Sequence, residues 1–311
     1  MSKIFTVFGV TGQQGGALIK YLLDHPVFSK EYTFRAVTRD ATKPAAVALR
    51  KKGVEIVEAD MNKPETLVEA MTGTHTVFAL TNWVESMDPA VEVVQGKALA
   101  DAAVKAGGVK LYIWSSLPRT GMAHFDSKAE VEEYIRRTFP AMTTTTTTRS
   151  FFFMPGWFMQ NFVRIMKPKK RDGVDGETEY VLAQPFPGAT LDTALPLIDI
   201  EDTGKFIAPF LSDPEKYAGK QFFACTGNYT IREICQTWAT ATGTKIVYDE
   251  QVDAIAESDM GEAVKESLKN RDRSQGYYGP EGDEGIDWTL AQIQEKLTTW
   301  EEFVKRNEPW F

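Results

Sequence analysis

Short apolar segments alternate with amphipathic segments along the first half of the chain. Segments rich in Val, Ile, Phe and Thr predict strands at 3–8, 33–38, 54–59, 75–81 and 109–115. Helical spacing of apolar residues between them predicts helices at 13–24, 43–52, 64–72 and 89–106. This alternation is typical of an α/β fold in which helices cover both faces of a parallel sheet. We therefore expect a Rossmann-type, doubly wound sheet that binds its ligand beyond the carboxyl ends of the strands.

The pattern becomes less regular after residue 140. We expect residues 1–150 to form the sheet domain, and residues 151–311 to form mainly a smaller α+β C-terminal lobe with later strands returning to the sheet. The six threonines of Thr143–Thr148 favour a buried strand over a linker because β-branched residues suit strands. The aromatic cluster between Phe151 and Phe158 is expected to be mostly core, with the wall of a ligand pocket as the alternative.

Shorter patterns predict individual elements of the C-terminal lobe. Thr230 and Glu233 form a capping box that predicts a helix closing at Gly243. A strand is expected at 220–225 and loops at 168–188. The glycine-rich segment 271–285 is expected to be a surface loop, with a mobile flap as the alternative.

Composition excludes several classes of protein. The chain has 311 residues, of which 43% are hydrophobic, and a net charge of -8. No apolar run approaches the roughly 18 to 20 residues of a membrane-spanning helix. Two cysteines and three histidines predict neither disulfides nor a metal site and favour a reducing compartment, the cytoplasm, with nuclear entry left open. The acidic balance disfavours direct nucleic-acid binding, and the basic run at 167–171 is expected to be a solvated loop rather than a DNA-binding or import patch.

A glycine-rich turn follows the first predicted strand. Gly9, Gly12 and Gly15 have the spacing G-x-x-G-x-x-G and lead directly into the first predicted helix. A Cβ atom at such a turn would keep a pyrophosphate away from the free N–H groups at the positive end of the helix. Strand, glycine turn and helix together predict a dinucleotide site, and the alternative is a tight turn that binds nothing.

Polar residues at the ends of the next two strands indicate which nucleotide is bound. Arg39 lies where the adenosine ribose is expected, and an arginine there favours the 2′-phosphate of NADP over the free hydroxyl of NAD. Alternatively, Arg39 pairs with Asp40 on the surface. Asp60 ends the third strand and either meets the adenine edge or is a carboxylate at a helix N-terminus.

Several ordered motifs resemble the NmrA-like family, an atypical branch of the short-chain dehydrogenases, and in particular its HSCARG-type NADPH sensors. The motifs are FGVTGQQGG at 8–16, VTRD at 37–40, TNWVES at 81–86, VVQGKALADAA at 93–103, HFDSKAEVEEYIR at 124–136, WFMQN at 157–161 and LSDPEKYAGK at 211–220. The resemblance implies a Rossmann domain with a small C-terminal lobe that binds NADP(H). It assigns the pyrophosphate to Gly9, Thr11, Gly12, Gln13, Gln14 and Gly15, the 2′-phosphate to Arg39, and the ribose and nicotinamide to Asn82, Trp83, Lys97 and Lys128.

One expected catalytic residue is missing. Short-chain dehydrogenases that reduce carbonyls use a Tyr-x-x-x-Lys pair, and His124 stands four residues before Lys128 where the tyrosine is expected. Tyr134 falls on another helical face and is not expected to replace it. Ser127 and Glu130 suggest a capping box that places Lys128 at the first helical position, where the positive helix end favours loss of its proton. The alternatives are an exposed lysine and a structural histidine.

Two functions follow from this pattern. An intact dinucleotide loop without the tyrosine favours a redox-sensing regulator whose NADP(H) occupancy changes its affinity for a transcription factor or another regulatory protein. The alternative is an NADPH-dependent reductase of a carbonyl, imine or enone in which Lys128 or His124 donates the proton. The sequence determines neither the substrate nor the oligomeric state.

Overall fold

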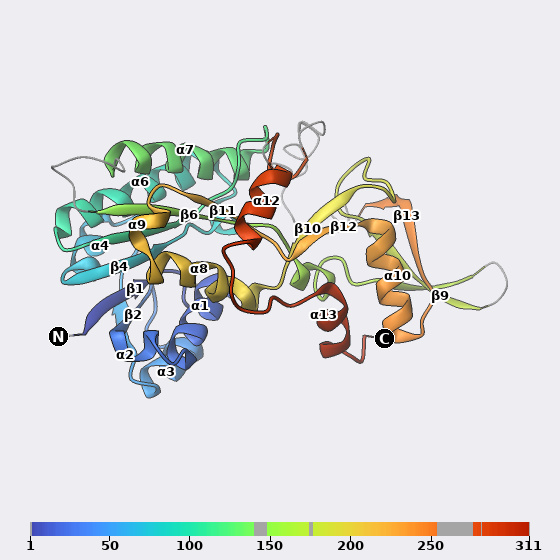
Figure 1. Ribbon diagram of the computed structural model, residues 1–311, viewed down its shortest axis with the longest axis horizontal. Coiled ribbons are helices and arrows are strands. Elements are labelled where there is room, and N and C mark those ends of the chain that lie inside the picture. The colour runs from blue at the N-terminus through green and yellow to red at the C-terminus, as the bar shows by residue number, and fades with distance from the viewer. Residues whose placement is uncertain (1, 140–147, 174–176, 254–275, 281, 311) are drawn as a thin grey trace. The chain divides into compact units, whose positions relative to one another are not determined.

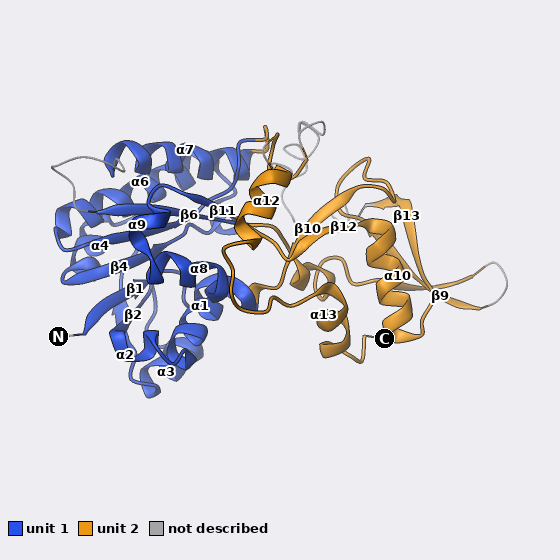
Figure 2. Cartoon of the chain, in the orientation of Figure 1, with its two compact units in different colours: residues 1–119, 123–154, 201–222 blue, residues 120–122, 155–200, 223–311 orange. Residues whose placement is uncertain are grey.

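The chain is divided into two compact units (Figure 2). The computed structural model describes residues 2–139, 148–173, 177–253, 276–280 and 282–310. Unit 1 comprises residues 1–119, 123–154 and 201–222, and unit 2 comprises 120–122, 155–200 and 223–311. The two units therefore interleave along the sequence, and residues 201–222 belong to unit 1 although a long stretch of unit 2 precedes them.

Unit 1 is built on a seven-stranded sheet with the order β11-β6-β5-β4-β1-β2-β3. Strands β1 to β6 pair in parallel. The strand order reverses between β1 and β4, which is where doubly wound sheets bind ligands. The strands are β1 (Lys3–Val7), β2 (Tyr32–Thr38), β3 (Glu55–Glu58), β4 (Thr74–Ala79), β5 (Leu111–Ser115), β6 (Arg149–Pro155) and β11 (Gln221–Ala224), the last two reaching the boundary with unit 2.

Helices cover both faces of this sheet. Helices α4, α6 and α7 lie over one face, and α1 and α8 lie over the other (Figure 1). Every residue of β5 is buried, as is typical of a central parallel strand covered on both sides. The helices are α1 (Gln13–Asp24), α2 (Phe28–Glu31), α3 (Pro44–Lys51), α4 (Pro64–Met71), α5 (Trp83–Ser86), α6 (Pro89–Ala106), α7 (Ala123–Thr138), α8 (Thr203–Ser212) and α9 (Pro214–Tyr217).

Hydrophobic periodicity predicted most of unit 1. The five expected strands and four expected helices of the first half are confirmed, with ends that differ by at most two residues. Leu18, Ile19 and Leu22 are buried on α1 as their spacing predicted. Phe151, Phe152 and Phe153 are fully buried in β6, so the core interpretation of this part of the aromatic cluster is correct.

Unit 2 contains two three-stranded sheets, ordered β12-β10-β7 and β13-β9-β8. Its cysteines, Cys225 and Cys235, are both buried and free. The strands are β7 (Trp157–Phe158), β8 (Lys169–Asp172), β9 (Thr178–Gln184), β10 (Ala194–Ile198), β12 (Gly227–Thr230) and β13 (Ile246–Asp253). The helices are α10 (Ile231–Thr242), α12 (Gly282–Leu290) and α13 (Trp300–Arg306), with 3-10 turns η1 (Met159–Phe162) and, at the unit boundary, η2 (Ile200–Asp202).

The expectation of loops throughout 168–188 was wrong. Strands β8 and β9 pair antiparallel there. The basic run at 167–171 is solvated as expected, because every residue of β8 is exposed, but it forms an edge strand. Arg171 is held in that strand by Glu179 of β9 and Asp249 of β13. Glu179 lies eight positions from Arg171 and Asp249 lies 78 positions away, so the second partner at least could not be read from local composition.

Two other expectations fall partly outside the described residues. Residues 143–147 of the threonine run and residues 271–275 of the glycine-rich segment are not described. The rest of that segment is only partly the expected surface loop, since α12 begins at Gly282 and Tyr278 is 5% exposed. The Tyr278 ring packs edge-on against Phe223 with 5.0 Å between ring centroids, which accounts for its burial.

The predicted capping box at the start of α10 is confirmed. The Thr230 side chain accepts a hydrogen bond from the Glu233 amide, and the Glu233 carboxylate accepts one from the Thr230 amide. Replacing Thr230 with alanine is expected to lower the free energy of unfolding by about 1 kcal/mol because the helix start loses its cap. Urea unfolding followed by circular dichroism measures this. Thr244→Ala, just beyond the other end of α10, is the control, and equal losses in the two variants would contradict the prediction.

Candidate functional site

The turn after β1 leaves a helix start open. Gly9 has φ = 65°, which favours glycine, and its carbonyl accepts the Gly12 amide at 2.9 Å. Gly12 is the N-cap of α1 and supplies no capping side chain, and the first turn holds no acidic residue. The positive end of a twelve-residue helix is therefore left for an external anion. Thr11 and Gln13 are exposed beside it.

Gly15 allows the close approach of this helix to the turn. A Cβ atom at Gly15 would lie 2.6 Å from the carbonyl oxygens of both Gly9 and Phe8. Both are backbone atoms that cannot swing aside. The tight turn between strand and helix that the glycines predicted is therefore present, and it exists only while position 15 has no side chain.

Gln14 connects the glycine turn by a hydrogen bond to the end of another strand. Its side-chain oxygen accepts a hydrogen bond of 2.7 Å from the hydroxyl of Ser115, the last residue of β5. This hydrogen bond fixes the position of the loop against β5. Because the contact spans 101 positions of sequence, no local pattern indicated it.

Arg39 does not pair with Asp40. Its guanidinium lies 2.6 Å from the carboxylate of Glu85, and both side chains are about half exposed. Asp40 instead accepts hydrogen bonds from the side chain and the backbone amide of Thr42, which lower the pKa of its carboxyl. Glu85 also accepts a hydrogen bond from the Asn82 side chain, so it brings two of the predicted site residues together.

Asp60 organises a turn ahead of α4. Its carboxylate accepts the Asn62 amide at 2.9 Å, and its carbonyl accepts the Lys63 amide at 2.8 Å. Lys63 rather than Asp60 is the N-cap of α4. Of the two interpretations offered for Asp60, the structure places it in a turn before a helix and leaves the adenine contact a prediction.

The predicted capping box at Ser127 and Glu130 was wrong. Helix α7 already begins at Ala123, so Ser127 and Lys128 lie in its second turn. The Ser127 hydroxyl donates to Glu92 of α6 at 2.5 Å instead of accepting a backbone amide hydrogen at a helix start. The proposed effect of the positive helix end on Lys128 therefore does not apply.

A buried carboxylate holds Lys128 instead. The Lys128 ammonium donates to Glu92 Oε1 at 2.7 Å and to the hydroxyl and carbonyl oxygens of Thr81 at 2.9 and 3.3 Å. These contacts use all three of its N–H bonds. The Glu92 side chain is 1% exposed and that of Lys128 is 12% exposed. Burial raises the pKa of Glu92, but Lys128 and the hydroxyls of Ser127 and Thr81 outweigh this and lower it overall.

Sequence reasoning missed Glu92, although a pattern was available. Gly96, Leu99 and Ala103 follow it at intervals of four, three and four residues, and all are buried on α6. A carboxylate in an apolar helical stripe requires a partner in the interior, since a buried charge is costly unless it is paired. That partner could not be named from sequence because Lys128 lies 36 positions away.

The remaining predicted residues have varied surroundings. Trp83 is 8% exposed, and its indole N–H has no hydrogen-bond partner within the part of the chain that the structure describes. Its ring centroid lies 5.7 Å from that of His124. Lys97 pairs with Glu130 at 2.7 Å. The Tyr134 hydroxyl donates to Asp101, in agreement with the expectation that it does not replace the missing tyrosine.

Two findings concern membrane-spanning helices and metal sites among the described residues. None of their helices is both long and apolar enough to cross a membrane. No group of three or more His, Cys, Asp or Glu side chains gathers among them as metal ligands do.

Known proteins agree with this fold. A model of the NmrA-like family matches residues 1–304. The chain belongs to the NmrA-like family. This confirms the resemblance found in the sequence motifs, and the match extends over both units of the NmrA-like protein.

Two relatives and one solved structure illustrate the range of the family. An NmrA-like family domain-containing protein of Dictyostelium discoideum is 27% identical over 320 residues, 98% of each chain. The NmrA-like family domain-containing oxidoreductase notA of Aspergillus sp. (strain MF297-2) is 31% identical over 265 residues, 79% of this chain and 75% of that protein. The crystal structure of NmrA, a negative transcriptional regulator, in complex with NADP is 21% identical, covers 99% of this chain and 96% of that one, and gives a TM-score of 0.78. The same regulator has been solved with NAD. The Rossmann-like, doubly wound fold is thereby confirmed.

Proposed function

We propose that this NmrA-like protein binds NADP(H) at the turn between β1 and α1. The observation that carries the proposal is the uncapped start of α1 behind a glycine turn that has no room for a Cβ atom. These features suit a pyrophosphate, which takes hydrogen bonds from backbone N–H groups at a helix start. The residues proposed for the pyrophosphate are Gly9, Thr11, Gly12, Gln13, Gln14 and Gly15. Those proposed for the rest of the nucleotide are Arg39, Asp60, Asn82, Trp83, Lys97 and Lys128.

We further propose that the bound nucleotide regulates a protein partner, such as a transcription factor. Two observations support regulation over catalysis. His124 replaces the tyrosine of the Tyr-x-x-x-Lys pair, and the Lys128 ammonium already donates to Glu92 and Thr81. These hydrogen bonds fix the end of β4 against α6 and α7, and Lys128 would contact the nucleotide only by exchanging one of them. The relative NmrA, named as a negative transcriptional regulator, adds support from the family.

A reductase is the second candidate, favoured by the oxidoreductase names of several fungal relatives. In that case NADPH supplies the hydride, and Lys128 or His124 donates the proton to a carbonyl, imine or enone. Lys128 would have to exchange one of its present hydrogen bonds for one to the substrate. His124 has Trp83 and Phe125 rings beside it.

One experiment separates the two functions. The purified protein is titrated with NADPH and NADP by calorimetry and then incubated with NADPH and a panel of carbonyl, imine and enone acceptors. Binding of both forms without turnover, together with different partner affinities for the two forms, supports the regulator. Turnover that is lost in Lys128→Ala or in His124→Ala supports the reductase. If calorimetry detects no heat of binding with either nucleotide at millimolar concentration, both proposed functions are overturned.

Arg39 provides a test of nucleotide choice. Arg39→Gln is expected to weaken NADPH binding about tenfold, since an arginine–phosphate contact contributes about 1.5 to 3 kcal/mol. Binding of NADH, which has no 2′-phosphate, is expected to stay unchanged. Arg119→Gln is the matched control because Arg119 forms a similar half-exposed ion pair with Glu133 at 2.8 Å. Equal NADPH affinities of Arg39→Gln and wild type would show that Arg39 does not select the phosphate.

A further inference from the structure

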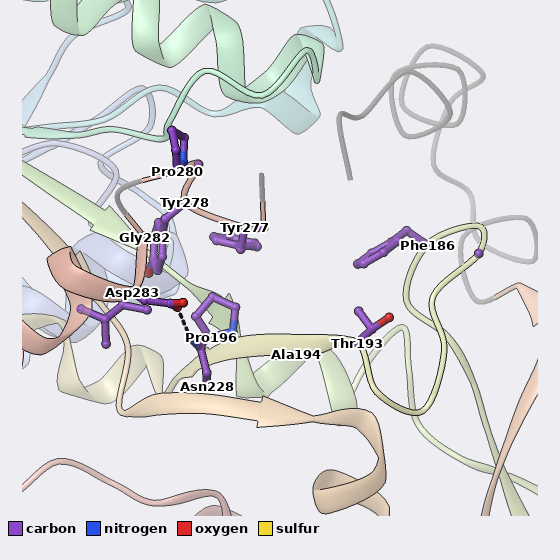
Figure 3. A pocket seen from close by; sticks show the side chains of 14 residues that line it. Phe186, Thr193, Ala194, Pro196, Asn228, Tyr277, Tyr278, Pro280, Gly282 and Asp283 are labelled. Atoms are coloured by element: carbon purple, nitrogen blue, oxygen red, sulfur yellow. Dashed lines mark hydrogen bonds between the residues drawn. The ribbon is translucent and has the colours of Figure 1, made fainter. Parts of the chain in front are cut away.

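Unit 2 contains a cavity of about 530 Å³ that none of the proposals above uses. Strand β10 supplies Pro196, and the start of β12 supplies Asn228. The segment before β10 supplies Phe186 and Thr193. The segment leading into α12 supplies Tyr277, and the first turn of α12 supplies Asp283. Figure 3 shows Tyr277 and Phe186 on opposite sides of the hollow. A volume between about 300 and 1,000 Å³ is typical of small-molecule sites. All lining residues belong to unit 2, whereas the glycine turn belongs to unit 1.

The aromatic wall of this cavity is held in place. Tyr278 is 5% exposed, and Tyr277 packs edge-on against it with 4.9 Å between ring centroids. Gly156 lets the wall approach β10, because a Cβ atom there would lie 2.1 Å from the Pro196 carbonyl oxygen and 3.0 Å from the Tyr278 hydroxyl. Such packing fixes the rings before a ligand arrives, which lowers the entropy lost on binding.

The described residues that line the cavity carry a single charge, which is negative. Asp283 is the only charged residue among the described residues that line it. Asn228 donates to Asp283 Oδ1 at 3.1 Å (Figure 3), and this hydrogen bond orients the carboxylate and leaves its second oxygen outside the pair. Burial raises the pKa of the nearby Cys225 thiol, a backbone hydrogen bond with Gly227 lowers it, and the charges of Asp283 and Asp287 raise it further.

An anion is a poor occupant of this cavity. The start of α12 lines it, and a helix start attracts anions, but Asp283 and Glu284 already lie in its first turn. A second negative group there would be repelled. A cation is a better occupant, because a carboxylate and the faces of aromatic rings both attract it.

We propose that this cavity binds a flat aromatic amine in its protonated form. The aromatic part lies among Tyr277, Pro196 and Phe186, and the ammonium group donates to the second carboxylate oxygen of Asp283. The proposal does not depend on nucleotide binding, because the two sets of residues do not overlap.

Three probes of nearly equal shape test the charge preference. Tryptamine is cationic at pH 7, tryptophol is neutral and indole-3-acetate is anionic. Calorimetry on the full chain is expected to show tryptamine binding about tenfold more tightly than tryptophol, the effect of about 1.4 kcal/mol from one charged contact, and no binding of indole-3-acetate. No binding of tryptamine, or equal binding of all three, overturns the proposal.

Two variants and one control variant locate the bound amine. Asp283→Asn keeps an oxygen for the Asn228 hydrogen bond and is expected to reduce the preference for tryptamine over tryptophol to within about threefold. Glu284→Gln removes the same charge one residue away, outside the cavity lining, and is expected to keep the preference. Ala194→Phe places a ring in the hollow from an exposed position of β10 and is expected to abolish binding of both probes. Binding that survives Ala194→Phe, or a preference that survives Asp283→Asn, places the amine elsewhere and overturns the proposal.

Discussion

Replacing Gly15 with alanine is expected to lower the affinity for NADPH about 100-fold. The added Cβ atom would lie 2.6 Å from two backbone carbonyl oxygens, so the turn must open and the N–H groups at the start of α1 move from their positions. A 100-fold loss corresponds to about 2.7 kcal/mol of binding free energy. We also expect a loss of about 1 to 3 kcal/mol in the free energy of unfolding, as for other overpacked sites. Calorimetry with NADPH and urea unfolding measure the two effects.

A second glycine provides the control. Gly53 also has a positive φ, 84°, but nothing lies within 4 Å of the position that a Cβ atom would occupy. Gly53→Asn is expected to keep NADPH affinity and most of the stability, since asparagine tolerates this backbone conformation. If Gly15→Ala bound NADPH as tightly as Gly53→Asn does, the glycine turn would not be the nucleotide cradle.

Replacing Glu92 with glutamine is expected to destabilise the protein by about 3 kcal/mol at neutral pH. The amide keeps the size of the side chain but leaves the nearly buried Lys128 ammonium without a counter-charge, and breaking a buried pair typically costs about 3 to 5 kcal/mol. Urea unfolding measures the loss. Glu130→Gln is the matched control, because its pair with Lys97 is partly exposed and should contribute less than about 1 kcal/mol. Equal losses in the two variants would contradict the prediction.

The loss in Glu92→Gln should depend on pH. The pKa of Glu92 lies below its ordinary value of 4.5 in the folded protein, so the unfolded chain binds the proton more tightly. The stabilisation by the carboxylate is therefore complete above pH 4.5 and is lost as the pH falls through the lowered value. The difference between wild type and Glu92→Gln should shrink accordingly in acid. The double variant Glu92→Gln, Lys128→Met should recover much of the lost stability at pH 7, because it also removes the unpaired charge.

Features of the fold that depend on local sequence patterns were predicted correctly. Spacing of apolar residues located the strands and helices of the first half, and the glycines of the first turn predicted its backbone. The failures concern partners that are distant in sequence. Helix α7 begins one turn before the apparent cap at Ser127, whose hydroxyl instead donates to Glu92. Arg39 forms its ion pair with Glu85 and not with its neighbour Asp40. Such contacts depend on how elements pack, and a single sequence does not contain that information in local form.

The burial of both cysteines limits how this protein can respond to oxidants. Burial raises the pKa of Cys225 and of Cys235 to about 12 each. At pH 7 only about one thiol in 100,000 is then a thiolate, the form that reacts with peroxides and alkylating reagents. Sulfenic acid formation and glutathionylation should therefore leave the folded chain untouched. Oxidation of Cys225 and Cys235 is therefore not expected to be the route by which oxidants act on this protein.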